Sequence, residues 1–366
     1  MTALISVLAL LALAAPLTFL LVKAHDGKKL FNISVERLRR VLALVLLGLS
    51  FARYIYYQVA MYHVRGLSNP ISPFNIGTPR PLLTALAVIL IWFSYAAMMA
   101  VVMNEFFKYK TLERITNCFA YPVYLIIIVF FKFYGIAVLG TENFALSSVR
   151  VWITVLEMAV AVALNTSRII AERKFEYPKT KRELGAFFYG LIPALACIAP
   201  CYVLQAFFAG LDPSLKLYDF TPEHRLMLYM AFVIPFAIFH LLREKDVEEK
   251  RFIMIYYSLS SLWIYLGRWN LEMLADPLSW PLHLCNTAMF LVPLCLVFRM
   301  NRLFNFCLFI NVLGAFIAMV APDIEGYNAI GVDCVSYWVN HYSAFYMPLL
   351  LVALKIFKRP KFKEWV

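Results

Sequence analysis

Residues 303–320 read LFNFCLFINVLGAFIAMV and contain no charged side chain. Because an α-helix rises about 1.5 Å per residue, a run of this length covers most of the roughly 30 Å hydrocarbon core of a bilayer. The segment therefore predicts a transmembrane helix.

Similar apolar runs recur along the whole chain. The sequence is 63% hydrophobic and 15% charged, with a mean hydropathy of +0.74, and this balance excludes a water-soluble protein of this size. The first run has no basic residue before it and no cleavage site after it, so we interpret it as a span and not as a secretory signal. We expect an all-α, polytopic membrane protein of about 11 transmembrane helices, at 3–22, 36–59, 82–104, 115–135, 148–167, 185–208, 226–242, 252–272, 281–298, 303–320 and 336–357.

Lys and Arg residues concentrate in alternate connections between these runs. The net charge is +12, and no nucleic-acid motif accompanies it, so we interpret the charge as a topology signal and expect no nucleic acid as partner. The positive-inside rule predicts an amino end outside and a carboxyl end in the cytoplasm. We expect the protein in the plasma membrane. The basic clusters lie at 23–40, 108–114, 173–182, 243–251, 299–302 and 358–361.

The two halves of the chain resemble each other. Residues 36–57 are similar to 249–270, and Asn-Pro-Ile-Ser at 69–72 is similar to Asp-Pro-Leu-Ser at 276–279. Both copies would start outside, which predicts a parallel 5+1+5 pseudo-repeat. The expected domains are a degenerate five-helix repeat at 1–170, a linker with the sixth helix at 171–225, and a five-helix module with the candidate site at 226–366.

Polar side chains inside spans are costly in a bilayer, so their positions are a guide to function. Cys285 and His341 each lie about one turn inside the outer end of a predicted span, at similar depth. A thiol and an imidazole at one depth predict a nucleophile and a base, with a thioester formed on Cys285. The structural alternatives are that Cys285 is a packed small residue and that His341 bonds to a neighbouring span.

Further side chains near this depth are candidates for binding substrate or supporting the pair. His283 and Cys285 cannot both face one site on a helix, because residues two apart point about 200° apart. Arg268, with Arg53 as its counterpart in the first half, suits binding of a lipid phosphate or carboxylate, or snorkelling to the headgroups. Asp323 is alternatively a counter-ion for Arg268. The candidates are His283, Asn286, Arg268, Asn270, Asp323 and Asn340.

The sequence predicts no metal site and no cofactor. Cys197 and Cys201 share a helix face at i, i+4 but lack further ligands. Cys334 has no evident disulfide partner. Glu157 is an intramembrane carboxylate with no evident ion partner.

Several short motifs occur together over residues 250–357: WPLHLCN at 280–286, RLF at 302–304, Gly314, Pro-Asp at 322–323 and His341. In this combination the chain resembles the YwaF-type bacterial membrane proteins and the eukaryotic transmembrane protein 164 family. The resemblance implies an acyltransferase that moves a fatty acyl group between phospholipids through a cysteine thioester, with Cys285 and His341 as the matching residues.

The first half departs from that family pattern. Typical bacterial members contain about one such module, whereas this chain adds residues 1–225. Residues 73–76 (PFNI) of the first half align with residues 281–284 of the second half, and the aligned first half contains no Cys and no His pair. We therefore expect the first half to have no catalytic activity. Two other functions stay open: a non-enzymatic transporter or receptor for a small or lipid-like molecule, and a structural partner in a membrane complex.

Overall fold

Regular structure in this protein is almost entirely helical, which confirms the predicted all-α class. The computed structural model describes residues 2–27, 29–30, 33–65, 81–107, 109–127, 149–197, 214–267 and 284–360. In these ranges the exceptions are a two-stranded antiparallel hairpin, β1 (Lys29–Leu30) with β2 (Ile33–Ser34), and a bridge between Lys216 and Asn328. The chain divides into two compact units, Met1–Ala196 and Cys197–Val366.

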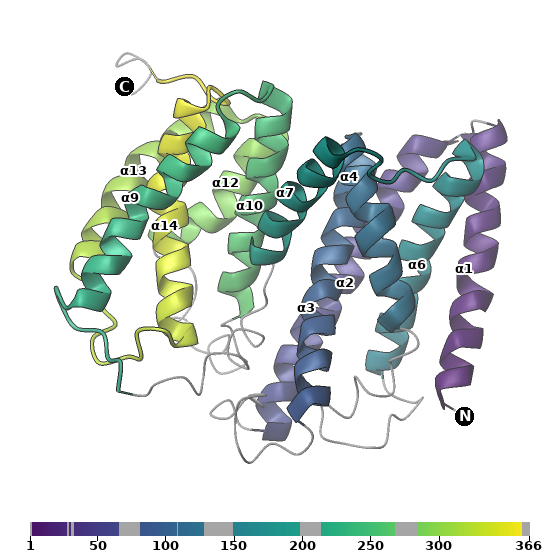
Figure 1. Cartoon of the computed structure of the whole chain (residues 1–366), viewed down its shortest axis with the longest axis horizontal. Coiled ribbons are helices and arrows are strands. Elements are labelled where there is room, and N and C mark those ends of the chain that lie inside the picture. The colour runs from purple at the N-terminus through teal and green to yellow at the C-terminus, as the bar shows by residue number, and fades with distance from the viewer. Residues whose placement is uncertain are drawn as a thin grey trace. The chain divides into compact units, whose positions relative to one another are not determined.

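The first unit is built around α6, which packs against both α1 and α2 (Figure 1). α2 in turn packs against α3, and α3 against the π-helical turn η1. The elements are α1 (Thr2–Gly27), α2 (Val35–Arg65), α3 (Pro81–Phe106), α4 (Lys110–Ile115), η1 (Thr116–Ala120), α6 (Val149–Glu172) and α7 (Lys181–Cys197).

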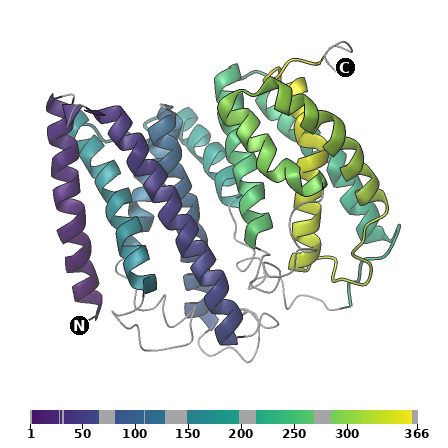
Figure 2. The ribbon, with the colours of Figure 1, turned by 180° about the vertical axis from the view of Figure 1, so that it is seen from behind.

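The second unit is built around α14, which contacts every other helix described in that unit. Figures 1 and 2 show α9 and α13 beside it. Residues 340–348 are all buried, as expected of a helix enclosed by its neighbours. The elements are α9 (Pro222–Leu242), α10 (Val247–Gly267), α12 (Leu284–Phe298), α13 (Asn301–Val320) and α14 (Val332–Ala353).

Several helices begin at side-chain caps that the sequence encodes, and α7 and α9 are two of them. At α7, Thr180 Oγ1 accepts from the Glu183 amide, while Glu183 Oε2 accepts from the Thr180 amide, which forms a capping box. At α9, Thr221 Oγ1 accepts from the amide of His224 and Pro222 occupies the first turn. These caps satisfy amides that a helix end leaves without partners.

Long apolar helices make this an integral membrane protein. Four of the described helices are long and apolar enough to span a bilayer, at Val7–Gly27, Trp152–Glu172, Pro222–Leu242 and Asn301–Val320. Large apolar side chains lie on their outer faces; Phe236 is 72% exposed and Phe19 66% exposed. Surfaces of this kind are typical of contact with lipid. Each predicted span overlaps a described helix, while the count of 11 crossings stays a prediction.

The segment expected to link two repeats, α7, lies in the first unit. Trp92 Nε1 donates to the Leu195 carbonyl at 2.7 Å, and a Cβ on Gly190 would lie 2.9 Å from Ile115 Cδ1. α7 therefore contacts α3 through Trp92 and α4 through Ile115. The domain boundaries at 170 and 225 remain predictions.

Candidate functional site

Two predicted site residues meet between α12 and α14. The Asn340 Nδ2 group donates a hydrogen bond to Asn286 Oδ1, and the Asn340 side chain is buried. A carboxamide pair that is shielded from water fixes the rotation and the height of one helix against the other. This bond therefore defines the register of α12 against α14.

Cys285 and His341 are the chain neighbours of this hydrogen-bonded pair. Cys285 directly precedes Asn286 in α12, and His341 directly follows Asn340 in α14. Each lies one residue from the hydrogen-bonded pair, so the two helices approach each other beside both positions. The Cys285 side chain lies outside the described residues, so its approach to His341 stays a prediction.

His341 is held by its own helix in a defined tautomer. Its Nδ1 lies 2.8 Å from the Tyr337 carbonyl oxygen. Because a carbonyl only accepts, Nδ1 carries the proton and Nε2 is the basic nitrogen of the neutral ring. The Tyr337 ring packs on the imidazole with centroids 4.0 Å apart, and its hydroxyl donates to the Ala318 carbonyl at 2.5 Å. This tautomer is the one that a general base needs, with its free lone pair on Nε2.

A stripe of polar atoms without partners runs along α14 beside this site. Ser336, Asn340 and Ser343 recur at i, i+4 and i+7, which places them on one helix face. All three are buried, and Ser336 Oγ, Asn340 Oδ1 and Ser343 Oγ find no hydrogen-bond partner within the described part of the chain. We call these three residues the α14 polar stripe. The sequence analysis missed the two serines, although their spacing from Asn340 was a usable signal.

The remaining predicted site residues are not brought into this cluster by the described structure. Asp323 is exposed in the connection between α13 and α14 and makes no ion pair or hydrogen bond with any residue described. His283, Arg268 and Asn270 lie outside the described residues. Cys201 does too, so its pairing with Cys197 is not tested.

His224 has a structural role in the same unit. The Phe220 amide donates to its Nδ1 at 2.9 Å, so the proton is on Nε2, which lies 2.8 Å from the Met319 carbonyl. Through this bond His224 ties α9 to α13 and is not available as a base.

The expectation that Glu157 lacks an ion partner is wrong. Arg53 Nε lies 2.6 Å from Glu157 Oε2, and both side chains are almost fully buried. Ser50 donates to the same carboxylate at 2.6 Å, and the guanidinium lies over the Tyr95 ring at 4.2 Å. A guanidinium so fully engaged is not free to bind a lipid phosphate. Sequence reasoning missed this pair because its members are 104 residues apart.

The fold and this site define a class: a multi-pass α-helical membrane protein with a buried polar site between α12 and α14. The sequence model of the TMEM164 family matches residues 219–366, which contain all five helices of the second unit. The match thus supports the transmembrane protein 164 part of the resemblance. Comparison with curated proteins gives no match, and comparison with solved structures gives none.

Proposed function

We propose that this protein is a membrane-embedded lipid acyltransferase that uses Cys285 as nucleophile and His341 as general base. The observation that carries the proposal is the hydrogen bond between Asn340 and Asn286, because it sets the two helices in register beside both residues. The tautomer of His341 supports it, since Nε2 is the nitrogen that can take a proton. The match of residues 219–366 to the TMEM164 family is consistent with the likeness that suggested this chemistry.

The reaction runs in two half-steps. In the first, His341 Nε2 takes the Cys285 thiol proton and the thiolate attacks an ester carbonyl of a phospholipid. The ester C–O bond breaks, the lysophospholipid oxygen takes the proton from His341, and the acyl group remains as a thioester. In the second, His341 accepts a proton from the hydroxyl of a second lipid or of water, that oxygen attacks the thioester, and the thiol is regenerated.

The α14 polar stripe supports a lipid substrate for this site. A buried polar atom without a hydrogen-bond partner costs roughly 1–3 kcal/mol, so three such atoms on one helix face favour a ligand or water that satisfies them. The glycerol and ester oxygens of a phospholipid are suitable partners at this depth. The acyl chain itself needs only apolar contacts.

Acyl-adduct trapping on the purified full-length protein tests this proposal. With a labelled phospholipid, intact mass should show an acyl adduct on the wild type, none on Cys285→Ser, and a weaker one on His341→Ala. Cys118→Ser is the matched control, because Cys118 is a partly exposed thiol of the other unit, and it should keep the adduct. An adduct that persists in Cys285→Ser would contradict the proposal.

A transporter or receptor for a small or lipid-like molecule is the second candidate. The α14 polar stripe favours it as well, because unpartnered polar atoms inside a helical bundle are typical of a ligand path. This function needs no reactive thiol. Binding of a labelled lipid that survives in Cys285→Ser, with no adduct in any variant, would favour it.

We also propose that the chain arose by a parallel duplication, with the amino end outside and the site on the outer side of the plasma membrane. Corresponding helices have corresponding neighbours: α6 packs on α1 and α2, as α14 packs on α9 and α10. Likewise α3 packs on α2 and η1, as α12 packs on α10 and α13. Two copies of one five-helix module would be expected to have the same pairs of neighbouring helices.

A further inference from the structure

Two short segments pair with each other beside the ends of α9, α13 and α14 that the predicted topology places outside. The Leu217 amide donates to the Tyr327 carbonyl, and the Gly326 amide donates to the Leu217 carbonyl, both at 2.8 Å. We call residues 215–221 and 324–331 the outer cap, because they join the start of α9 to the connection between α13 and α14. The proposed function does not use this cap.

His224 fastens the outer cap to the helices beside it. The residue has no exposed surface, and both ring nitrogens are bonded: Nδ1 accepts from the Phe220 amide at 2.9 Å, and Nε2 donates to the Met319 carbonyl at 2.8 Å. The centroid of its ring lies 5.7 Å from that of Trp338. One side chain of α9 thus contacts the outer cap, the end of α13 and the first half of α14.

The bond from the Phe220 amide exists only while the His224 ring is neutral. A backbone amide only donates, so Nδ1 must offer its lone pair. A proton on Nδ1 would turn both groups into donors, and the bond between them would be lost. Uptake of one proton therefore removes the contact that holds Phe220.

A second acceptor for a charged ring lies close by. Asp219 Oδ1 is 4.0 Å from His224 Nδ1, and this carboxylate is 45% exposed. Among the residues that the structure describes, no other carboxylate lies within ion-pair distance of the imidazole. The other charged or titratable groups of the same elements are Lys216, Glu223, Arg225, Asp323, Glu325, Asp333 and His341. A protonated ring can thus exchange the Phe220 amide for the Asp219 carboxylate.

The backbone of Phe220 favours its release. Its φ is 55°, in the left-handed region that a residue with a side chain rarely adopts. The residue is 52% exposed, and its ring packs on His224 with centroids 5.5 Å apart. Without the bond to His224, Phe220 would be free to return to an ordinary backbone conformation.

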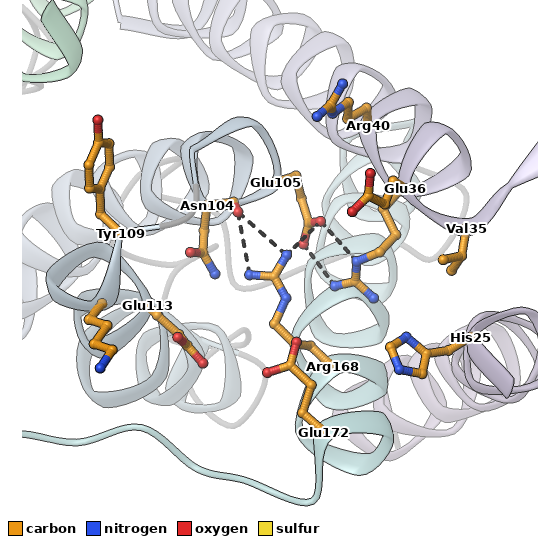
Figure 3. Close-up of a pocket in the computed structure, with 12 residues that line it drawn as sticks. His25, Val35, Glu36, Arg40, Asn104, Glu105, Tyr109, Glu113, Arg168 and Glu172 are labelled. Carbon is orange, nitrogen blue, oxygen red and sulfur yellow. Dashed lines mark hydrogen bonds and ion pairs between the residues drawn. The ribbon is translucent and has the colours of Figure 1, made fainter. Parts of the chain in front are cut away.

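The other described histidines lack this arrangement. His25 is exposed and lines a charged cavity of the first unit, together with equal numbers of cationic and acidic side chains (Figure 3). His240 is exposed on α9. His341 carries its proton on Nδ1, and its Nε2 accepts no bond from any described residue, so it can take up a proton without giving up a bond.

We propose that His224 is an acid-sensitive latch: a proton from solvent binds Nδ1, the ring moves from the Phe220 amide to the Asp219 carboxylate, and residues 218–221 of the outer cap are released. Histidine side chains ordinarily take up a proton near pH 6.5, so the latch responds to mild acid on the side of the membrane where the cap lies. Because Trp338 lies two residues from Asn340, release of the cap changes the surroundings of the outer part of α14. The latch operates whichever reaction the site catalyses.

Hydrogen–deuterium exchange of the full-length protein in detergent tests the latch. Exchange is measured at about pH 7.5 and about pH 5, on either side of the ordinary histidine range, and corrected for the intrinsic effect of pH. In peptides that contain Phe220, the corrected rate in the wild type should rise at least about tenfold in acid. In His224→Gln it should not change with pH, because glutamine stays uncharged.

His240→Gln is the matched control, because it removes an exposed histidine from the same helix, and it should respond like the wild type. Peptides of α6, in the other unit, are the reference for general loosening in acid. A corrected rate that stays constant in the wild type would overturn the latch, and so would an equal rise in His224→Gln. The comparison within the wild type holds even where a variant fails to fold.

Asp219→Asn tests the second acceptor. With the carboxylate removed, the charged ring has no anionic partner, so Tm should fall further in acid than it does in the wild type. The Tm difference between the two proteins should therefore widen from neutral pH to about pH 5. An equal loss of Tm in both would overturn the exchange of partners.

Discussion

At the scale of single residues, the most consequential side chains are charges that the fold has taken out of water. Arg53 and Glu157 form such a pair in the first unit, with exposures of 2% and 1%. Removing one partner leaves the other as an unpaired buried charge, which typically lowers the free energy of unfolding by about 3–5 kcal/mol. Replacing both partners by apolar groups is often nearly neutral. Each charge of such a pair therefore requires the other to be present, although the pair as a whole contributes little to the stability of the fold.

We accordingly expect Arg53→Met to destabilise the protein by several kcal/mol, and the double variant Arg53→Met, Glu157→Met to lose less than either single variant. Unfolding free energies in mixed micelles would measure this. Losses that simply add in the double variant would show that the pair does not interact.

Glu113 gives a pH-dependent prediction. Because burial and Glu172 raise its pKa, the folded state binds this proton more tightly than the unfolded state does. The stability from this group is present below the ordinary glutamate pKa of about 4.3 and is lost as pH rises through the raised pKa. Glu113→Gln should therefore raise Tm at neutral pH and lose this advantage in acid. A Tm difference that grows in acid would contradict the assignment.

At the scale of elements, close approach of helices depends on small residues at defined positions. A Cβ added to Gly190 on α7 would lie 2.9 Å from Ile115 Cδ1, the end of that side chain, so even a methyl group there requires Ile115 to shift. Gly185 on the same helix has no atom within 4 Å of an added Cβ. The two glycines form a matched pair for testing how tightly α7 packs on α4.

Gly190→Leu should destabilise the protein by about 1–3 kcal/mol through overpacking, while Gly190→Ala should cost little, since only the end of Ile115 must move. Gly185→Ala should be neutral or stabilising by up to about 1 kcal/mol, because alanine favours the helix. Thermal melts of these three variants and of Gly185→Leu decide this. Equal effects of leucine at positions 185 and 190 would refute the close packing.

The register of α12 against α14 gives a second prediction at this scale. A double-mutant cycle on Asn286→Ala and Asn340→Ala should show a coupling of about 0.6–2 kcal/mol, the range for hydrogen bonds between transmembrane helices. Asn340→Ala should also slow formation of the acyl adduct. For stability alone Ser343→Ala is the control, because its hydroxyl has no partner among the described residues and its loss should not destabilise. A coupling near zero would remove the main support for the proposed site.

At the scale of the whole molecule, the question is which side of the membrane each connection faces. Asp323 lies in a connection predicted outside, and Lys181 lies in one predicted inside; both are exposed. A membrane-impermeant maleimide should label Asp323→Cys on intact cells and label Lys181→Cys only after permeabilisation. The unsubstituted protein sets the background from its own seven cysteines. The reverse pattern would invert the topology and move the proposed site to the cytoplasmic face.

The amino-acid sequence alone determined the positions of the helices and the membrane class. In a bilayer each backbone amide must be bonded within the segment, so a long apolar run becomes a helix whatever surrounds it. For this reason each predicted span overlaps a described helix, and the cap at Thr180 and Glu183 could be found from local spacing.

Only the tertiary structure decided which polar residues meet. Two of the predicted site residues, Asn286 and Asn340, form a hydrogen bond across 54 residues, while Arg53 pairs with Glu157, and Glu105 pairs with Arg39 and Arg168. A helix can present any face to its neighbours, and its rotation is set by packing over its whole length. Contacts between distant segments therefore follow from the packed bundle, whereas the helices themselves follow from the local sequence.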